Sequence, residues 1–255
     1  MHPWIETVTL TPATTPITVL PPDPATTVVW RMTPAGDSDV LVAGPRTTAA
    51  YHTTKELPVC VRLRIRPGGV IPLLGTSPDQ LVDQVVPLES FCGTSATTLA
   101  EQLVTYREQP ARAADALSDY LATRAPRRLP ARLELVRNAV AELTASPAEE
   151  PAASAVLPGV RAASAASRRV DEAAARLGVS ERYLRRVFRQ AVGVSPKHFA
   201  RIARVRMVIG TRHSWADTAA YAGYTDQSHL IADFRALMHV TPKAYATGNV
   251  PLSIC

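Results

Sequence analysis

The chain has few of the residues that build metal centres or covalent cross-links. It contains only three cysteines in 255 residues, Cys60, Cys92 and Cys255, and their spacing matches no metal-binding pattern. The first half has only His2 and His52, whereas a metal-dependent barrel brings several histidines and a carboxylate together. We therefore expect no metal and no cofactor. Cys60 is expected to be a buried thiol and Cys255 a flexible one, and a redox role for Cys92 is a further option.

Long apolar runs and catalytic signatures are also missing. No run approaches the ~18 apolar residues that a membrane-spanning helix needs, and no basic stretch near the N-terminus leads into an apolar segment. The sequence contains no Gly-x-Ser-x-Gly, no phosphate-cradling glycine loop and no Cys-x-x-Cys. These absences predict a soluble, cytoplasmic protein that does not contact a membrane and is not an enzyme.

The C-terminal part of the chain carries one pattern twice. Six residues recur forty-six positions later, without a gap, as residues of matching size and polarity. The pairs are Leu184 and Leu230, Phe188 and Phe234, Val194 and Val240, Ser195 and Thr241, Pro196 and Pro242, and Phe199 and Tyr245. A repeat of this length holds two or three short helices, so the chain is expected to end in two copies of one helical module.

Each copy begins with a pattern typical of a helix-turn-helix. Residues 171–178 predict a short helix in which the small Ala174 lies four residues before Gly178, and Ser180 is the N-cap of the next helix. The small residue lets two helices cross closely, and glycine adopts the turn geometry. The second copy, residues 215–223 with Asp226 as its cap, has a turn one residue longer. An ordinary helical hairpin is the alternative for one such pattern, but two in register favour the helix-turn-helix.

Positive charge is concentrated in the same region. Residues 161–255 contain thirteen arginines and two lysines against six acidic residues, a net charge of +9, whereas the whole chain carries +6. The first 160 residues therefore carry −3. The outward residues of the helix after Ser180 are four arginines, Arg182, Arg185, Arg186 and Arg189. A guanidinium fits the guanine edge in a major groove or binds a phosphate, so this helix predicts binding to double-stranded DNA, with a merely solvated basic face as the alternative.

Residues 195–211, between the two modules, predict one continuous helix. Pro196 occupies its first position, and its inward residues are Phe199, Ile202, Val205 and Ile209. Seventeen residues at ~1.5 Å each span roughly 25 Å, which is comparable with the ~34 Å between successive major grooves on one face of DNA. This helix is therefore expected to hold two reading helices apart.

The order of these motifs resembles the DNA-binding domain of AraC/XylS-type transcription regulators over residues 165–247. The matching parts are Ala-x-x-x-Gly at 174–178, Leu-x-x-x-Phe at 184–188, Gly-Val-Ser-Pro at 193–196 before the long helix, Gly-Tyr-Thr-Asp-Gln-Ser-His-Leu at 223–230, and Phe234 with Val-Thr-Pro-Lys-Ala-Tyr at 240–245. In that family the positions two residues before and after the helix leucine contact bases. The resemblance therefore implies base contacts by Arg182 and Arg186 in the first module and by Ser228 and Ala232 in the second.

One position departs from the family pattern. The family commonly has an arginine where this chain has Ala232, and alanine can offer only a methyl group to thymine. We therefore expect the first module to supply most of the sequence specificity and the second mainly to position the protein. The predicted DNA-binding residues are Arg182, Tyr183, Arg185, Arg186, Arg189, Gln227, Ser228, His229 and Ala232.

Residues 1–145 predict a domain of a different kind. Short apolar runs at 17–20, 28–30, 40–43 and 59–65, separated by turn sequences, indicate strands. Helices are expected at 99–108, 112–124 and 131–145, and the last carries an apolar stripe that packs on its own domain or, alternatively, on a partner: Leu133, Val136, Val140 and Leu143. Residues 146–158, of low complexity and rich in proline and alanine, predict a linker.

The fold class expected from these patterns is α+β. It combines a β-rich barrel or sandwich domain with trailing helices over residues 1–145, the linker at 146–158, and an all-α domain over 159–255 in which a long helix joins two helix-turn-helix units. Residues 40–93 are also similar to a cupin-like sensor domain, on the stretches 41–45, 63–69 and 85–93. That resemblance implies a fold that can hold one small ligand.

The sequence as a whole predicts a bacterial transcription regulator that binds double-stranded DNA and responds to an unidentified small-molecule effector. RNA polymerase is the expected protein partner, and a homodimer is a further option. One alternative is a DNA-repair or DNA-modifying enzyme that uses the same DNA reader and needs a reactive cysteine. The other is a ligand-independent dimeric DNA-binding protein.

Overall fold

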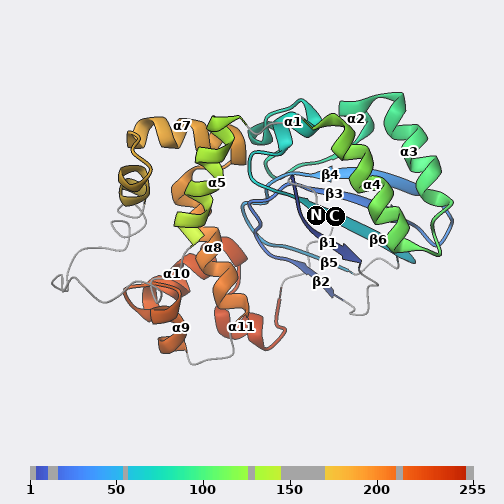
Figure 1. The fold of residues 1–255 in the computed structure, drawn as a ribbon. Coiled ribbons are helices and arrows are strands. Elements are labelled where there is room, and N and C mark those ends of the chain that lie inside the picture. The colour runs from blue at the N-terminus through green and yellow to red at the C-terminus, as the bar shows by residue number, and fades with distance from the viewer. Residues whose placement is uncertain are drawn as a thin grey trace.

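The structure, a computed structural model, has a β-rich N-terminal half and an all-helical C-terminal part (Figure 1). It describes residues 4–10, 17–53, 57–125, 130–144, 170–210 and 215–250. We call residues 4–125 the N-terminal domain and residues 170–250 the C-terminal domain. This arrangement confirms the predicted α+β class. No helix among the described residues is both long and apolar enough to span a bilayer.

Among the described residues, seven strands form two antiparallel sheets rather than one closed ring. The larger sheet has the order β1 (Ile5–Leu10), β6 (Val59–Ile65), β3 (Thr27–Met32), β4 (Ser38–Ala43) and β7 (Val85–Pro87). The smaller sheet pairs β2 (Ile17–Leu20) with β5 (Ala50–Thr53). The apolar runs predicted as strands correspond to β2, β3, β4 and β6.

Alternation of side chains places one face of the larger sheet in the core. Residues of β3 alternate between half-buried and buried, as expected for a strand with one covered face. In register, Val28 lies opposite Leu63 of β6 and Val42 of β4, and all three side chains are fully buried. Each such cross-strand apolar set stabilises the pairing and opposes a one-residue slip, which would move these side chains to the other face.

Short helices cover the buried face of this sheet. They are α1 (Val70–Leu74), the 3-10 helix η1 (Pro78–Leu81), α2 (Glu89–Cys92), α3 (Thr94–Val104) and α4 (Pro110–Arg124). Leu99, Leu103, Leu117 and Leu121 of α3 and α4 belong to the same core as the sheet residues. The predicted helix at 99–108 was placed too late, because the chain tightens after Val104 into i to i+3 hydrogen bonds, such as Tyr106 N to Leu103 O at 3.0 Å.

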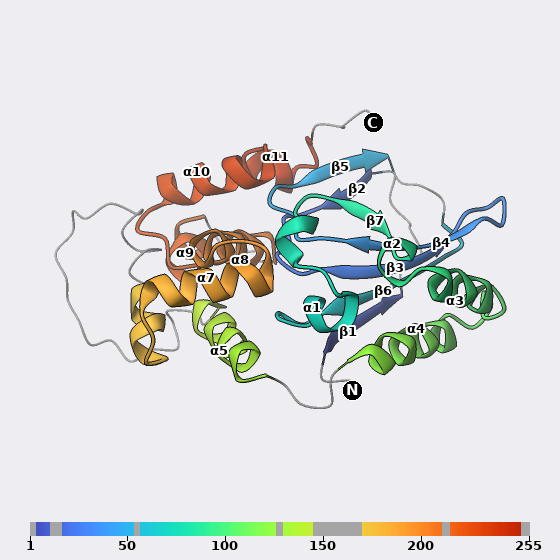
Figure 2. The same cartoon turned by 90° about the horizontal axis from the view of Figure 1, so that it is seen from above.

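The C-terminal domain begins in a helical segment at residues 170–176. In the part of the chain that the structure describes, five helices follow: α7 (Glu181–Val192), α8 (Pro196–Gly210), α9 (Trp215–Tyr221), α10 (Gln227–Met238) and α11 (Pro242–Ala246). The helix predicted at 195–211 is α8, and α7 and α10 lie on opposite sides of it in both views (Figures 1 and 2).

Helix α5 (Ala131–Thr144) packs on the C-terminal domain. Its buried residues Val136, Ala139 and Leu143 lie in one core with Leu184 and Phe188 of α7. The apolar stripe on α5 is therefore covered within the chain, by helices that follow it in sequence. The predicted linker at 146–158 lies outside the described residues, and the predicted domain boundaries stay a prediction.

We predict that Gly44→Ala destabilises the fold strongly. A Cβ atom at this position would lie 1.8 Å from the carbonyl oxygen of Leu81, which is backbone and has no room to move aside. Overpacking of this kind costs roughly 3 kcal/mol or more, which lowers the melting temperature of a protein of this size by about 5–10 °C.

Gly210→Ala is the matched control for this prediction, measured by the same thermal unfolding. Nothing lies within 4 Å of the position that its Cβ would take at the end of α8. It should leave stability unchanged or raise it by up to about 1 kcal/mol. Equal melting temperatures for the two variants would show that the approach of Leu81 to Gly44 is not a constraint.

Candidate nucleic-acid interface

The first helix-turn-helix unit has the turn that its sequence predicts. Gly178 adopts a left-handed conformation with φ of +67°, and Val179 N donates to Ala174 O at 3.0 Å to close the first helix. Ala174 is buried, as a small residue at a close helix crossing should be. The Ser180 Oγ accepts a hydrogen bond from Tyr183 N at 3.3 Å, so Ser180 caps α7 as predicted.

Helix α7 separates its residues sharply into two faces. Leu184, Val187 and Phe188 are fully buried. The outward face contains all five residues predicted for this helix, and each is exposed: Arg182, Tyr183, Arg185, Arg186 and Arg189. Burial of one side of the helix thus leaves the opposite, basic side free for a groove of DNA.

The exposed arginines of α7 differ in their local partners. Arg185 pairs with Glu181 one turn earlier, and the Arg186 guanidinium lies 5.4 Å from the centre of the Tyr183 ring. Arg182 and Arg189 form no ion pair with another described residue. A surface pair such as Arg185 with Glu181 is worth little, so all four arginines can be redirected to DNA at low cost.

The second unit repeats this turn with one residue inserted. Gly223 has φ of +70°, and Tyr224 N donates to Ala219 O at 2.8 Å, which is the counterpart of the bond that follows Gly178. Thr225 then lies between this bond and the cap, Asp226, whose carboxylate accepts from His229 N at 2.9 Å. The longer turn predicted from sequence is therefore accommodated just before α10, and it leaves the glycine bond unchanged.

Helix α10 presents a less basic surface than α7. Gln227, Ser228 and Ala232 are exposed, whereas His229 is partly buried and its Nδ1 atom lies 2.8 Å from the Asp226 carboxylate. The hydrogen bond from the His229 backbone amide lowers the pKa of Asp226, so the cap is an anion at neutral pH. His229 is therefore directed toward the helix cap, while the other three predicted residues point to solvent.

Helix α8 joins both units through its apolar side. Phe199, Ile202 and Val205 are buried as predicted, but Val208 is buried where Ile209 was expected. Its fifteen residues extend about 22 Å at ~1.5 Å per residue. Phe199 packs edge-on against Phe188 of α7, with ring centres 5.3 Å apart. Residues from Ile202 onward lie in the core of the second unit with Leu230 and Phe234.

A buried arginine network holds α10 to α8 and was not predicted from the sequence. Arg204 is only 5% exposed, donates to Asp233 at 3.2 Å and lies 4.9 Å from the centre of the Tyr224 ring. Arg201 also donates to Asp233, at 3.0 Å. The available signal was an arginine within the apolar stripe of α8, because a buried guanidinium requires a carboxylate, and Asp233 is the one acidic residue of α10.

A cavity of about 430 Å³ lies between the N-terminal domain and helices α5, α7 and α8. It has an apolar floor that includes Ile65, Val140 and Phe199, and its rim includes Glu6, Arg64 and Arg206. The Thr26 hydroxyl lines it as well, is buried, and has no hydrogen-bond partner among the described residues.

Ion pairs close the rim of this cavity. Asp23 is paired with Arg64 of β6 and, at 3.3 Å, with Arg206 of α8, so one carboxylate links the two domains. Arg64 also binds Glu6 at 2.7 Å. The Arg206 guanidinium donates in addition to the Pro22 carbonyl oxygen at 3.2 Å. None of these residues was singled out from the sequence, because their proximity arises only when β6 and α8 meet.

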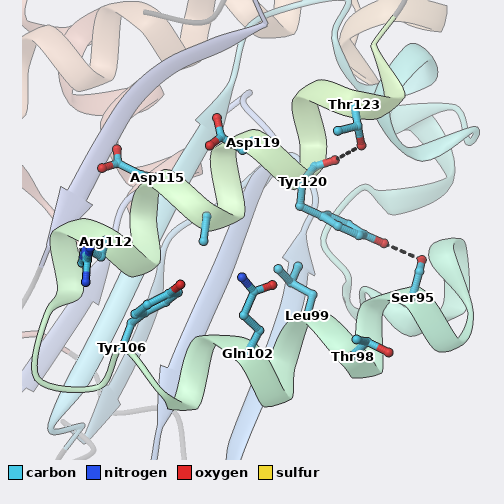
Figure 3. Close-up of a pocket in the computed structure, with 11 residues that line it drawn as sticks. Ser95, Thr98, Leu99, Gln102, Tyr106, Arg112, Asp115, Asp119, Tyr120 and Thr123 are labelled. Carbon is cyan, nitrogen blue, oxygen red and sulfur yellow. Dashed lines mark hydrogen bonds between the residues drawn. The ribbon is translucent and has the colours of Figure 1, made fainter.

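A second, more open hollow lies between α3 and α4 (Figure 3). Its volume is about 680 Å³, and Tyr106, Gln102 and Tyr120 point into it around an apolar floor that includes Leu99. The Tyr120 hydroxyl lies 2.7 Å from Ser95 Oγ.

Cys60 is buried and Cys92 is half-buried. The described residues contain no cluster of histidine, cysteine and carboxylate side chains suited to a metal ion.

Comparison with known proteins supports this description of the C-terminal domain. Residues 173–248 match the family model of a helix-turn-helix domain. No curated protein matches the sequence significantly. Among solved structures, the C-terminal domain of AraT, a response regulator from Geobacillus stearothermophilus, is 20% identical, with a TM-score of 0.36 over 51% of this chain and 94% of that chain.

Two further solved structures are similar to this chain. A probable AraC family transcriptional regulator from Rhodopseudomonas palustris CGA009 is 18% identical, with a TM-score of 0.33 over 46% of this chain and 99% of that one. Unsaturated fatty acid bound ToxT from Vibrio cholerae strain SCE256 is 11% identical, with a TM-score of 0.46 over 98% and 100% of the two chains. The family model thus identifies residues 173–248 of this chain as a helix-turn-helix domain.

Proposed function

We propose that this protein is a transcription regulator that binds specific sequences of double-stranded DNA and responds to a small molecule. The observation that carries the proposal is the exposed arginine face of α7 within a matched helix-turn-helix domain. In such units the second helix enters the major groove, and its N-terminal half contacts the bases. Helices α7 and α10 are the second helices of their units, and we call them the reading helices.

The two reading helices are proposed to have different roles in DNA recognition. Arg182 and Arg186 lie one turn apart on the exposed side of α7, so each can reach a base edge or a phosphate. At the equivalent positions α10 offers the small Ser228 and Ala232. The first unit is therefore proposed to supply most of the specificity. Tyr183, Arg185, Arg189, Gln227 and His229 would contribute contacts to phosphate and sugar, which orient the protein without discriminating sequence.

The cavity between the domains is the proposed effector site. Both domains line it, so a ligand bound there would bind more tightly to this arrangement than to one in which the domains separate. Its apolar floor, the buried hydroxyl of Thr26 and the arginines at its rim favour a small, largely apolar molecule with a polar or anionic group. A coupling of only ~1.4–3 kcal/mol would change DNA affinity ten- to hundredfold.

The alternatives have less support. A repair enzyme of the type considered needs a reactive cysteine, but Cys60 is buried in β6 and the described residues contain no metal cluster beside Cys92. A dimer that responds to no ligand would not account for the inter-domain cavity, in which the buried Thr26 hydroxyl has no hydrogen-bond partner among the described residues. We also expect contact with RNA polymerase at promoters. A homodimer stays a prediction, and the stripe of α5 that could have served it is covered within the chain.

We predict that Arg186→Ala reduces discrimination between specific and random duplexes more than Gln227→Ala does. Loss of a base-reading arginine costs about 1–3 kcal/mol on the preferred sequence and little on others. The measurement is a fluorescence anisotropy titration of each variant on a duplex selected by the wild-type protein and on a scrambled one. Arg112→Ala on α4 removes the same charge far from α7 and should leave both affinities unchanged. Equal loss of discrimination by Arg186→Ala and Gln227→Ala would refute the asymmetry.

We predict that a cavity ligand raises the melting temperature of the wild-type protein but not that of Ala203→Phe. At a hundred times its dissociation constant a ligand stabilises by about 2.7 kcal/mol. Ala203 lines the inter-domain cavity, and a phenyl group there would fill it. The matched control, Ala116→Phe, fills the hollow between α3 and α4 and should keep the shift.

The thermal-shift screen would use small carboxylic acids and other anionic metabolites, with the unliganded melting temperature of each variant as the check on folding. A shift that survives in Ala203→Phe and disappears in Ala116→Phe would move the effector site to the hollow of Figure 3. If no compound shifts the wild-type protein, the ligand-independent alternative gains support.

A further inference from the structure

The N-terminal domain contacts the C-terminal end of α7 through two hydrogen bonds. Gly68 N donates to the carbonyl oxygen of Ala191 at 3.2 Å, and Ser77 Oγ donates to that of Gln190 at 3.2 Å. The last four carbonyl oxygens of a helix have no partner within the helix and carry partial negative charge. The segment around Gly68 and Ser77 therefore acts as an external cap on the first reading helix.

The same domain contacts the C-terminal end of α10 in the same manner. Ala49 N donates to the carbonyl oxygen of Leu237 at 2.7 Å, and the buried hydroxyl of Tyr51 donates to that of Met238 at 2.6 Å. Burial raises the pKa of Tyr51 to about 12, so the hydroxyl keeps its proton and remains a donor at neutral pH. Strand β5 and the residue before it, Ala49, thus cap the second reading helix.

The two contacts lie at equivalent places in the repeat. Ala191 and Leu237 are forty-six residues apart, which is the repeat distance. The carbonyl oxygen of each accepts a hydrogen bond from a backbone amide of the N-terminal domain. One domain therefore contacts corresponding atoms of both units. Because Arg206 of α8 also pairs with Asp23, the N-terminal domain contacts both reading helices and the helix between them.

A sequence difference between the two copies follows from this contact. Gly193 and His239 are equivalent, and both adopt the left-handed conformation that ends a helix, with φ of +89° and +57°. At Gly193 a Cβ atom would lie 2.8 Å from the carbonyl oxygen of Pro78. The first copy thus requires glycine because the N-terminal domain approaches it, whereas the second copy accepts a side chain at the same position, and His239 is exposed.

The capped ends are not the ends that read DNA. Figure 2 shows α7 and α10 with their C-terminal ends toward the N-terminal domain and their N-terminal halves directed away from it. Arg182 and Arg186 on α7, and Gln227 and Ser228 on α10, remain exposed in this arrangement. The contact therefore leaves the reading surfaces open, which argues against simple occlusion of DNA by the N-terminal domain.

We propose that the N-terminal domain is a splint that fixes the mutual position of the two reading helices, with Tyr51 and Ser77 as positioning residues for DNA recognition. The proposal rests on the proposed DNA-binding function. It adds an explanation of why the protein would prefer one spacing between the two half-sites on DNA. The two ends of α8 pack in different cores, so bending of this one helix would move one unit relative to the other. Because the N-terminal domain is attached to both units, such a movement would break a cap. The splint sets the separation and phase of the two half-sites that the protein accepts.

The test compares full-length wild-type protein with Tyr51→Phe, Ser77→Ala and the double variant. Each substitution removes one hydrogen bond to a helix end and little volume. Tyr120→Phe is the matched control, since it removes a tyrosine hydroxyl bonded to Ser95 in the same domain (Figure 3). Tyr120 packs against the core of the N-terminal domain and not in the cores that hold the reading helices. The DNA is a duplex selected from a random library by the wild-type protein, together with a copy that carries two extra base pairs between the segments protected by the two units.

The expected result is a change in spacing preference. Two inserted base pairs shift the second half-site by about 7 Å along the duplex and roughly 70° around it, so the wild-type protein should lose at least about tenfold in affinity. The double variant should bind the original duplex about five- to tenfold more weakly and lose at most about threefold on insertion. Tyr120→Phe should match the wild-type protein on both duplexes.

The insertion penalty decides the outcome, because a merely structural role would weaken binding to both duplexes equally. A double variant that keeps the full tenfold penalty would overturn the proposal that Tyr51 and Ser77 position the reading helices. If the double variant melts far below the wild-type protein, Tyr51→Phe alone provides the same comparison. Failure of the wild-type protein to bind any duplex would instead refute the proposed function, so the two failures are distinguishable.

Discussion

Each helix-turn-helix unit depends on one aromatic contact that the repeat preserves. Phe188 of α7 meets Phe199 of α8 edge-on, with ring centres 5.3 Å apart and planes at 76°. Phe234 of α10 meets Tyr245 of α11 in the same geometry, at 5.8 Å and 67°. These rings, with the buried leucines one turn earlier, fix the rotation of each reading helix about its own axis. That rotation decides which residues face outward, so the basic surface of α7 is a consequence of its buried side.

The positive charge of the C-terminal domain serves two separate purposes. The arginines of α7 are exposed and bound at most by a surface ion pair or a ring contact. On α8, by contrast, Arg201 and Arg204 are held by Asp233, and Arg206 is held by Asp23. Arg204 is buried, so removing Asp233 would leave its charge uncompensated. Arg201 and Arg206 are partly exposed, but both are engaged in ion pairs within the protein. The net charge of this domain is therefore larger than the positive charge that is available for binding DNA.

The contacts between the domains lie where a bound ligand would act on both halves of the chain. The cavity, the Asp23 ion pairs and the caps on α7 and α10 all lie along the boundary between the N-terminal domain and the helices. A ligand in the cavity would contact α8 directly, and α8 packs against both units. Coupling between ligand binding and DNA binding would therefore need no long chain of contacts. It would need only a ligand that binds the joined domains more tightly than the separated ones.

Much of the local structure could be predicted because its causes are local in sequence. The glycine turns, the caps Ser180 and Asp226, the apolar spacing of α7 and α8 and the strands β3, β4 and β6 each follow from residues within one or two turns of the chain. The matched helix-turn-helix domain confirms the prediction made from the repeat. The bounds of α3 were wrong, since tightening of a helix end depends on weak i to i+3 bonds that composition does not reveal.

The sequence by itself determined that there are two helical units, which side of each second helix is buried, and that only the first is strongly basic. Tertiary structure alone decided that α5 packs with the first unit, that Asp233 neutralises two arginines of α8, and that Gly68, Ser77, Ala49 and Tyr51 bind the ends of the reading helices. The physical reason is range. Helical periodicity and capping act over a few residues, whereas these contacts join residues up to 187 positions apart and exist only after both domains have folded against each other.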